Sequence, residues 1–164
     1  MQFLSQNFVK YGLIMVAVMV GCLALMELTG QNQTFEHSPW AAFSTFVAPP
    51  LVWFLGLRAK KKAQEGRLTY RQGLGEGFKI SVVYAILSPF VTLAYYTLVN
   101  PPIVASTREA YGLVDATDAT VIQVDMFVQL VSALVWGTLC GAVLSLFLRT
   151  KTKENRSVAG ERRP

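Results

Sequence analysis

The chain has 164 residues, of which 52% are hydrophobic and only 15% are charged, and its formal net charge is +5. Soluble domains carry about 25% charged residues. The apolar residues form four uninterrupted stretches rather than stripes with a 3.6-residue period, which excludes a soluble helical bundle. A membrane β-barrel would need segments of alternating polarity, and the sequence has none in the required pattern. The fold class indicated is therefore all-α.

The four apolar stretches, residues 12–28, 40–57, 80–99 and 126–148, each have the length of a membrane-spanning helix. A helix needs about 20 apolar residues to cross the hydrocarbon core. With the flanking residues included, we predict helices over residues 10–29, 40–58, 70–99 and 121–149, all within one transmembrane domain of residues 1–149. Residues 150–164 are polar and highly charged, and we expect a disordered tail there.

The basic residues are distributed very unevenly. Apart from Arg108, all of them lie before the first stretch, between the second and third, or after the fourth. Short loops rich in Lys and Arg stay in the cytoplasm. We therefore predict a multi-pass protein of the cell inner membrane with both termini cytoplasmic. We expect the basic surface to contact anionic lipid headgroups. Nucleic acid is not an expected partner, because no known nucleic-acid-binding fold accompanies the charges.

Two features predict how the second and third helices are built. Pro49 and Pro50 lie halfway along the second stretch, where proline removes a backbone donor and crowds an earlier carbonyl, so we expect a kink or break. Broken helices also occur at transporter binding sites. Thr69 with Gln72 three residues later is typical of a capping box, which would start the third helix at about Tyr70.

Similar spacings give possible caps after the third helix. Thr120 with Gln123 predicts the start of the fourth helix, and Ser106 with Glu109 predicts a short surface helix in the loop before it. The loop of about twenty residues that contains the surface helix is too short to form a second domain.

Small residues recur along one side of two helices and are candidates for close helix packing. They are Ala17 and Gly21 in the first helix, and Ala133, Gly137, Gly141 and Ser145 in the fourth.

Polar residues also recur at helical spacing. The third helix carries Ser81, Tyr84, Ser88 and Thr92, and the fourth carries Asp125, Gln129 and Ser132. Two interpretations are open. The faces can hydrogen-bond to each other as structural contacts between helices. They can also form a path or pocket for a small polar solute.

The residues needed for metal or covalent chemistry are scarce. His37 is the only histidine, and Cys22 and Cys140 are the only cysteines, so we expect no metal and no cofactor. No nucleophile has a partner base nearby, so we expect no catalysis. Whether the two cysteines pair is open, although buried cysteines usually act as small apolar residues.

Several short motifs resemble those of the bacterial membrane proteins grouped as domain-of-unknown-function family 4199. They are Lys10-Tyr11-Gly12, Gly66-Arg67-Leu68-Thr69-Tyr70 with Gly73 and Phe78-Lys79, Asn100-Pro101, and a glycine-containing fourth helix ending at Arg149. The resemblance covers most of residues 9–149. It implies a four-helix integral membrane protein and brings no known activity or catalytic residue.

The sequence therefore predicts a membrane protein without catalysis that packs against itself or another membrane protein as a scaffold or accessory subunit. The alternative is a small oligomeric transporter or channel that uses the polar faces of the third and fourth helices.

Overall fold

The computed structural model describes residues 6–31 and 38–150, and within them every regular element is a helix. In chain order the elements are α1 (Asn7–Leu28), α2 (Pro39–Ala42), the π-helical turn η3 (Phe43–Val47), α3 (Ala48–Ala63), α4 (Tyr70–Ala94), the π-helical turn η4 (Tyr95–Val99), α5 (Ile103–Ala110) and α6 (Asp118–Leu148). The all-α prediction is confirmed. The predicted tail beyond Thr150, and His37, lie outside the described residues.

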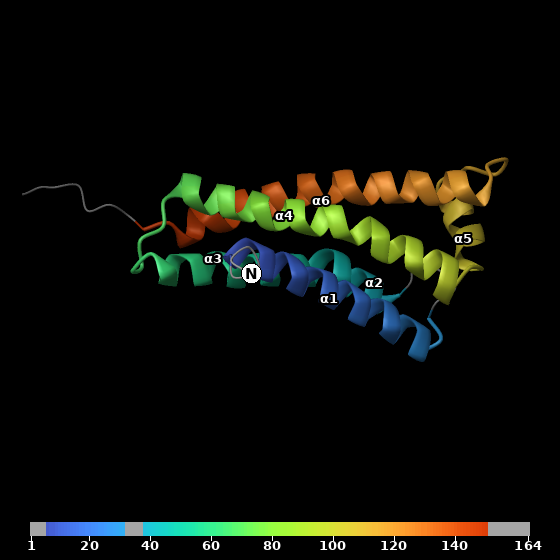
Figure 1. Cartoon of the computed structure of the whole chain (residues 1–164), viewed down its shortest axis with the longest axis horizontal. Helices are drawn as coiled ribbons and strands as arrows, with labels where there is room; N and C mark the ends of the chain where they lie inside the picture. The colour runs from blue at the N-terminus through green and yellow to red at the C-terminus, as the bar shows by residue number, and fades with distance from the viewer. Residues whose placement is uncertain (1–5, 32–37, 151–164) are drawn as a thin grey trace, which may run out of the picture.

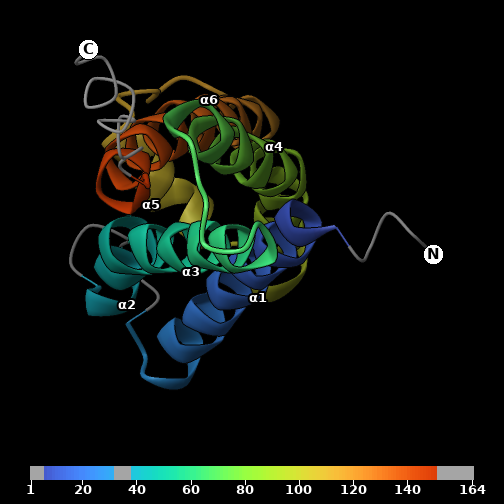
Figure 2. The same ribbon diagram turned by 90° about the vertical axis from the view of Figure 1, so that its left-hand side faces the viewer.

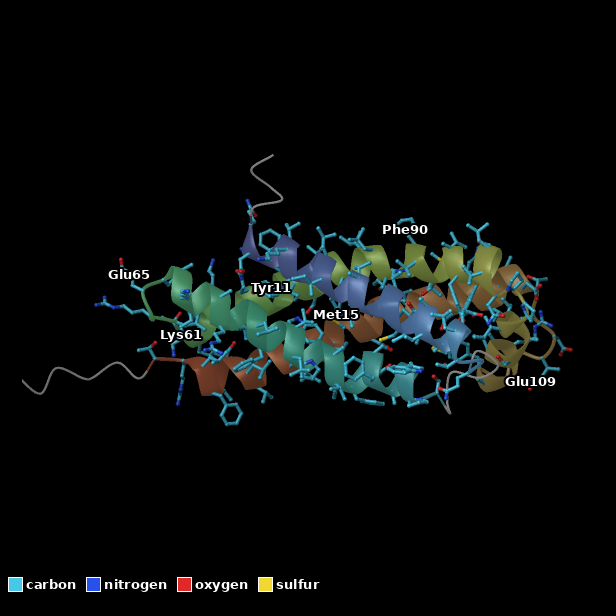
Figure 3. The ribbon with its side chains drawn as sticks, turned by 90° about the horizontal axis from the view of Figure 1, so that it is seen from below. Tyr11, Met15, Lys61, Glu65, Phe90 and Glu109 are labelled. Carbon is cyan, nitrogen blue, oxygen red and sulfur yellow. The ribbon has the colours of Figure 1, made fainter. Side chains whose placement is uncertain are left out.

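Among the described residues, four helical segments are long and apolar enough to cross a membrane: Asn7–Leu28, Pro39–Ala63, Tyr70–Val99 and Asp118–Leu148. Large apolar side chains cover their outer surfaces. Phe90 is 63% exposed and points away from the other helices (Figure 3), and Phe127 and Phe147 are exposed as well. So extensive an apolar surface is typical of contact with lipid. The chain is a multi-pass membrane protein.

The four spans form a bundle of two layers. Helices α4 and α6 lie side by side in one layer, and α1 and α3 form the other (Figures 1 and 2). The turn between α3 and α4 and the end of α6 lie together at one end, which we call the basic end. Helix α5 lies across the opposite end, which we call the α5 end. Figure 3 shows Lys61 and Glu65 near the former and Glu109 at the latter.

The second span is irregular, as the paired prolines predict. Pro49 and Pro50 fall in the first turn of α3, and the π-helical turn η3 comes directly before them. The first turn of a helix tolerates proline because its N–H groups have no intrahelical partner. The carbonyls one turn earlier lose their regular donors. The irregularity therefore appears at residues 43–47 rather than at the prolines themselves.

The predicted capping box is confirmed. The Thr69 side chain accepts a hydrogen bond from the Gln72 N–H (3.3 Å), and the Gln72 side chain accepts one from the Thr69 N–H (3.0 Å). Helix α4 begins at Tyr70, as expected from that box.

The other two predicted caps are wrong. The cap of α6 is Thr117, whose side chain accepts a hydrogen bond from the Thr120 N–H (3.3 Å). The helix therefore begins about one turn before the predicted start. This start places Asp118 in the first turn, where the helix dipole favours an acid. Helix α5 starts directly after Pro102, so Ser106 lies inside it. The fixed φ of proline favours a helix start there.

The α4–α6 pair is held by backbone contact between small residues. A Cβ built on Gly77 would lie 2.9 Å from the Cα of Gly141. One turn away on either side, Gly73 faces Ser145 and Gly137 faces Ser81. The structure thus places Gly137, Gly141 and Ser145 of the predicted small-residue stripe in the interface with α4, whereas Ala133 lines the cavity described below.

The small residues of α1 lie elsewhere. Ala17 and Gly21 are on the exposed side of the helix, and a Cβ on Gly21 would have nothing within 4 Å. Helix α1 instead approaches α4 at Gly12, where a Cβ would lie 2.5 Å from Val83 Cγ1. Met15, 2% exposed, is buried one turn further along α1.

Candidate functional site: a cavity at the α5 end

A cavity of about 1070 Å³ lies between the two layers toward the α5 end. All four spans and α5 contribute to its walls, including Met26 from α1, Phe46 from η3, Trp53 from α3 and Trp136 from α6. Ligand pockets for small organic molecules usually have volumes of about 300–1,000 Å³. The cavity is therefore large enough for such a molecule.

Asp125 of α6 is the centre of the polar groups in the cavity wall. It is 6% exposed. Its Oδ2 accepts hydrogen bonds from the Tyr96 hydroxyl (3.0 Å) and the Gln129 amide (2.9 Å), and its Oδ1 accepts one from the Tyr111 hydroxyl (2.5 Å). The carboxylate thus joins η4, α6 and the segment after α5. We call Asp125, Gln129, Tyr96 and Tyr111 the Asp125 cluster.

Further hydrogen bonds extend the Asp125 cluster. The Thr92 hydroxyl donates to Gln129 Oε1 (2.8 Å), which couples α4 to α6. Thr107 of α5 is within hydrogen-bonding distance of the Tyr96 hydroxyl (3.4 Å). Partial burial, with the hydrogen bond to Asp125, raises the pKa of Tyr111 well above its usual value. Tyr111 therefore remains a neutral donor to the carboxylate at physiological pH.

A second polar contact joins α1 to the same region. The hydroxyl of Tyr95, a buried side chain that lines the cavity, donates to Glu27 Oε1 (2.6 Å) and accepts from the Asn100 amide (3.3 Å). Hydrogen bonds to a charged acceptor are stronger than neutral ones. The Glu27 carboxylate is therefore held close to the cavity wall from the α1 side.

The remaining wall is rich in aromatic side chains. Seven aromatic side chains line the cavity: Phe46, Trp53, Tyr84, Tyr95, Tyr96, Tyr111 and Trp136. Trp53 is 1% exposed, and its indole N–H has no hydrogen-bond partner among the described residues. A buried donor without a partner is unfavourable, so the site lacks an acceptor at this position.

The structure separates the predicted polar residues into three groups. Thr92, Asp125 and Gln129 meet in the Asp125 cluster. Tyr84 and Ser132 line the same cavity but do not belong to the Asp125 cluster. The Tyr84 hydroxyl contacts the Met19 sulfur at 3.6 Å.

Ser81 and Ser88 belong to the packed part of α4. Both are buried, and the Ser81 hydroxyl donates to the Gly77 carbonyl (2.9 Å) in the contact with α6. A hydroxyl that bonds the carbonyl one turn earlier satisfies itself within its own helix. Ser81 therefore packs between helices and does not face the cavity.

The sequence did not predict a buried acid at the basic end. Glu76 of α4 is 4% exposed and accepts a hydrogen bond from the Asn7 amide (2.8 Å), while its other oxygen lies 3.5 Å from Lys60 Nζ. The same Asn7 amide also donates to the Gly56 carbonyl (3.0 Å). These contacts tie α1, α3 and α4 together. The signal was the four-residue spacing from Gly73 to Gly77, which puts Glu76 beside the packed face.

The described residues contain no cluster of three or more His, Cys, Asp or Glu side chains able to hold a metal ion. Cys22 and Cys140 are both free thiols, so they do not form a disulfide in this structure.

Comparison with known proteins identifies the family of the chain. No match was found among curated proteins or among solved structures. A family model described as "Protein of unknown function (DUF4199)" matches residues 10–150. Four long apolar helices agree with the membrane protein that the motif resemblance implies. The chain belongs to this family of proteins of unknown function, DUF4199.

Proposed function

We propose that the protein lies in the inner membrane with both termini and the basic end in the cytoplasm and with the α5 end outside. Lys60, Lys61 and Lys62 form the last turn of α3, at the basic end. Lys and Arg in short loops are retained in the cytoplasm. At the headgroup level, each also attracts anionic lipid by about 1 kcal/mol.

Cysteine labelling tests this orientation. In a chain with Cys22 and Cys140 replaced by Ala, a single cysteine is placed at exposed Arg67 or at exposed Asp115. A membrane-impermeant maleimide applied to intact cells is expected to label Asp115→Cys, and to label Arg67→Cys only after permeabilisation. The reverse pattern would overturn the orientation.

Within this orientation we propose that the chain is a small carrier that binds a solute in the cavity. The observation that carries the proposal is the position of the cavity. Its lining residues lie toward the α5 end, whereas at the basic end the two layers meet, with Asn7 of α1 and Lys60 of α3 contacting Glu76 of α4. A channel would need a continuous path, whereas a carrier is open to one side at a time.

The contacts that would have to open in a carrier cycle lie at the basic end. Glu76, Asn7 and Lys60 join the α1–α3 layer to α4, and Gly56 lies against Ile80, whose Cδ1 would be 2.7 Å from an added Cβ. Separation of the two layers there would open the cavity to the cytoplasm. Relative movement of helical units around a fixed site is how such carriers work.

Solute flux tests the carrier. The purified chain is reconstituted in liposomes, and protein-dependent uptake is measured for a panel of labelled organic cations, organic anions and neutral solutes. We expect uptake of at least one class that is lost with Asp125→Asn and kept with Phe90→Leu, a change on the outer surface. Absence of any protein-dependent flux would contradict the carrier.

A second candidate is an accessory or scaffold subunit, and the outer face of α1 favours it. Ala17, Gly21 and Ala24 are exposed along one side of that helix. Small residues let another helix approach closely in a membrane. If this face binds a second copy or another membrane protein, Gly21→Leu will dissociate the complex in mild detergent. Purification from the native membrane as a monomer without any partner protein would exclude this role. Neither candidate involves catalysis.

A further inference from the structure

We propose that the cavity binds an organic ammonium cation that carries an apolar group. Occupation of the cavity by this cation during transport rests on the proposed function, but binding of the cation can be measured without transport.

The charges around the cavity favour a cation. Two carboxylates, Asp125 and Glu109, line it. Among the described residues no Lys, Arg or His lines the cavity. The nearby Arg108 forms an ion pair with Asp118. In a site partly shielded from water, the Asp125 and Glu109 carboxylates repel an anion and attract a cation much more strongly than they would in bulk solvent.

The aromatic walls favour an organic cation over a metal ion. Tyr96, Tyr84 and Trp136 line the cavity together with Phe46 and Trp53. The faces of such rings attract ammonium groups within about 6 Å, and aromatic cages are a common way to bind quaternary ammonium. The described residues also lack a metal-binding cluster. Apolar side chains such as Met19, Leu23 and Met26 also line the cavity, which suits an apolar substituent on the cation.

The unpaired indole of Trp53 refines the choice of probe. Its N–H is buried and has no partner among the described residues, so a ligand carbonyl satisfies it only if the side chain turns toward the cavity. Benzoylcholine combines a quaternary ammonium, a carbonyl and an aromatic group. Its isostere 3,3-dimethylbutyl benzoate replaces the nitrogen by carbon, so only the charge differs between the two.

The test is calorimetric titration of the full chain in nanodiscs of a neutral glucosyl-diacylglycerol lipid. We expect benzoylcholine to bind at least about tenfold more tightly than its isostere, a difference of about 1.4 kcal/mol. Asp125→Asn is expected to remove this preference, and Phe90→Leu to keep it. Equal binding of both probes, or binding of neither, would overturn the inference.

A second variant and a second lipid extend the binding test. Should Asp125→Asn fail to fold, Glu109→Gln on the exposed side of α5 must reduce the preference by about threefold, which is about half of the tenfold effect in free energy. An unchanged preference would contradict the inference. In phosphatidylcholine nanodiscs, a site that takes the ammonium of a lipid headgroup will show weaker benzoylcholine binding, whereas a site for a free solute will not.

Failure of the inference and failure of the proposed function give different results. If benzoylcholine binds but no solute crosses liposomes, the ligand class stands and the carrier is wrong. If solutes of another class cross in a manner that depends on Asp125, the carrier stands and the cation is wrong.

Discussion

Replacing Gly77 by Ala tests whether backbone contact holds α4 against α6. The new methyl would lie 2.9 Å from the Gly141 Cα, whereas carbon atoms are about 3.5–4.0 Å apart at their optimal separation. The helices must therefore move apart by at least about 0.6 Å at this point. That shift loosens the neighbouring contact of Gly73 with Ser145. Overpacking of this kind costs about 1–3 kcal/mol.

The matched control is Gly75→Ala on the same helix. A Cβ at Gly75 has nothing within 4 Å, so it meets no neighbour. Both changes gain the same helix propensity, about 1 kcal/mol, and this gain cancels in their difference. In SDS titrations followed by circular dichroism, we expect Gly77→Ala to be less stable than Gly75→Ala by about 1–3 kcal/mol. Equal stability of the two variants would refute the reasoning.

Other changes address the Asp125 cluster, the capping box and the basic end, each measured by the same SDS titration. Asp125→Ala should cost about 2–3 kcal/mol because buried donors lose their acceptor, whereas Tyr111→Phe should cost only about 1 kcal/mol because Tyr111 is partly exposed. The reverse order would show that the cluster is not centred on the carboxylate. Thr69→Ala should cost about 1 kcal/mol through loss of the cap, and an unchanged midpoint would contradict the capping box. Lys60→Met should cost about 1 kcal/mol, since its ion pair with buried Glu76 is partly exposed to solvent. An equal effect of Lys62→Met would contradict this pairing.

The spans could be predicted because length and polarity suffice to define them, but polarity alone did not define every helix end. The second helix was expected to end at residue 58, and it continues to Ala63. Lys60, Lys61 and Lys62 are good helix formers, and positive charge favours a helix C-terminus. Polarity therefore marks where a helix leaves the hydrocarbon, and not where its backbone hydrogen bonds stop.

Part of the cavity wall followed from helical spacing. Thr92, Asp125 and Gln129 were predicted from their three- and four-residue steps, and they meet in the structure. Tyr96 lies four residues after Thr92, but its position near the membrane surface gave it a second explanation, because tyrosine is favoured there regardless of function. Tyr111 could not be placed, because its position depends on the turn that follows α5.

The glycines of α4 show a second limit. Gly73, Gly75 and Gly77 look alike in the sequence, where each weakens a helix by about 1 kcal/mol. In the structure Gly73 and Gly77 face α6 and Gly75 does not. The distinction depends on the partner helix, since four-residue steps on α4 match the small stripe ending at Ser145. Periodicity on one helix alone does not determine which of its faces is used.

Residue size along the α4–α6 pair accounts for both the closed half and the open half of the bundle. At the basic end, Gly77 against Gly141 lets the two backbones touch. Toward the α5 end the facing side chains are larger, as with Thr92 and Gln129, which meet through a side-chain hydrogen bond of 2.8 Å. Wider spacing there leaves room for the cavity, which α5 covers from one end. The glycine contacts and the Asp125 cluster therefore lie in different halves of the bundle. A substitution at Gly77 or Gly141 should lower the stability of the bundle and leave the ligand preference of the cavity unchanged.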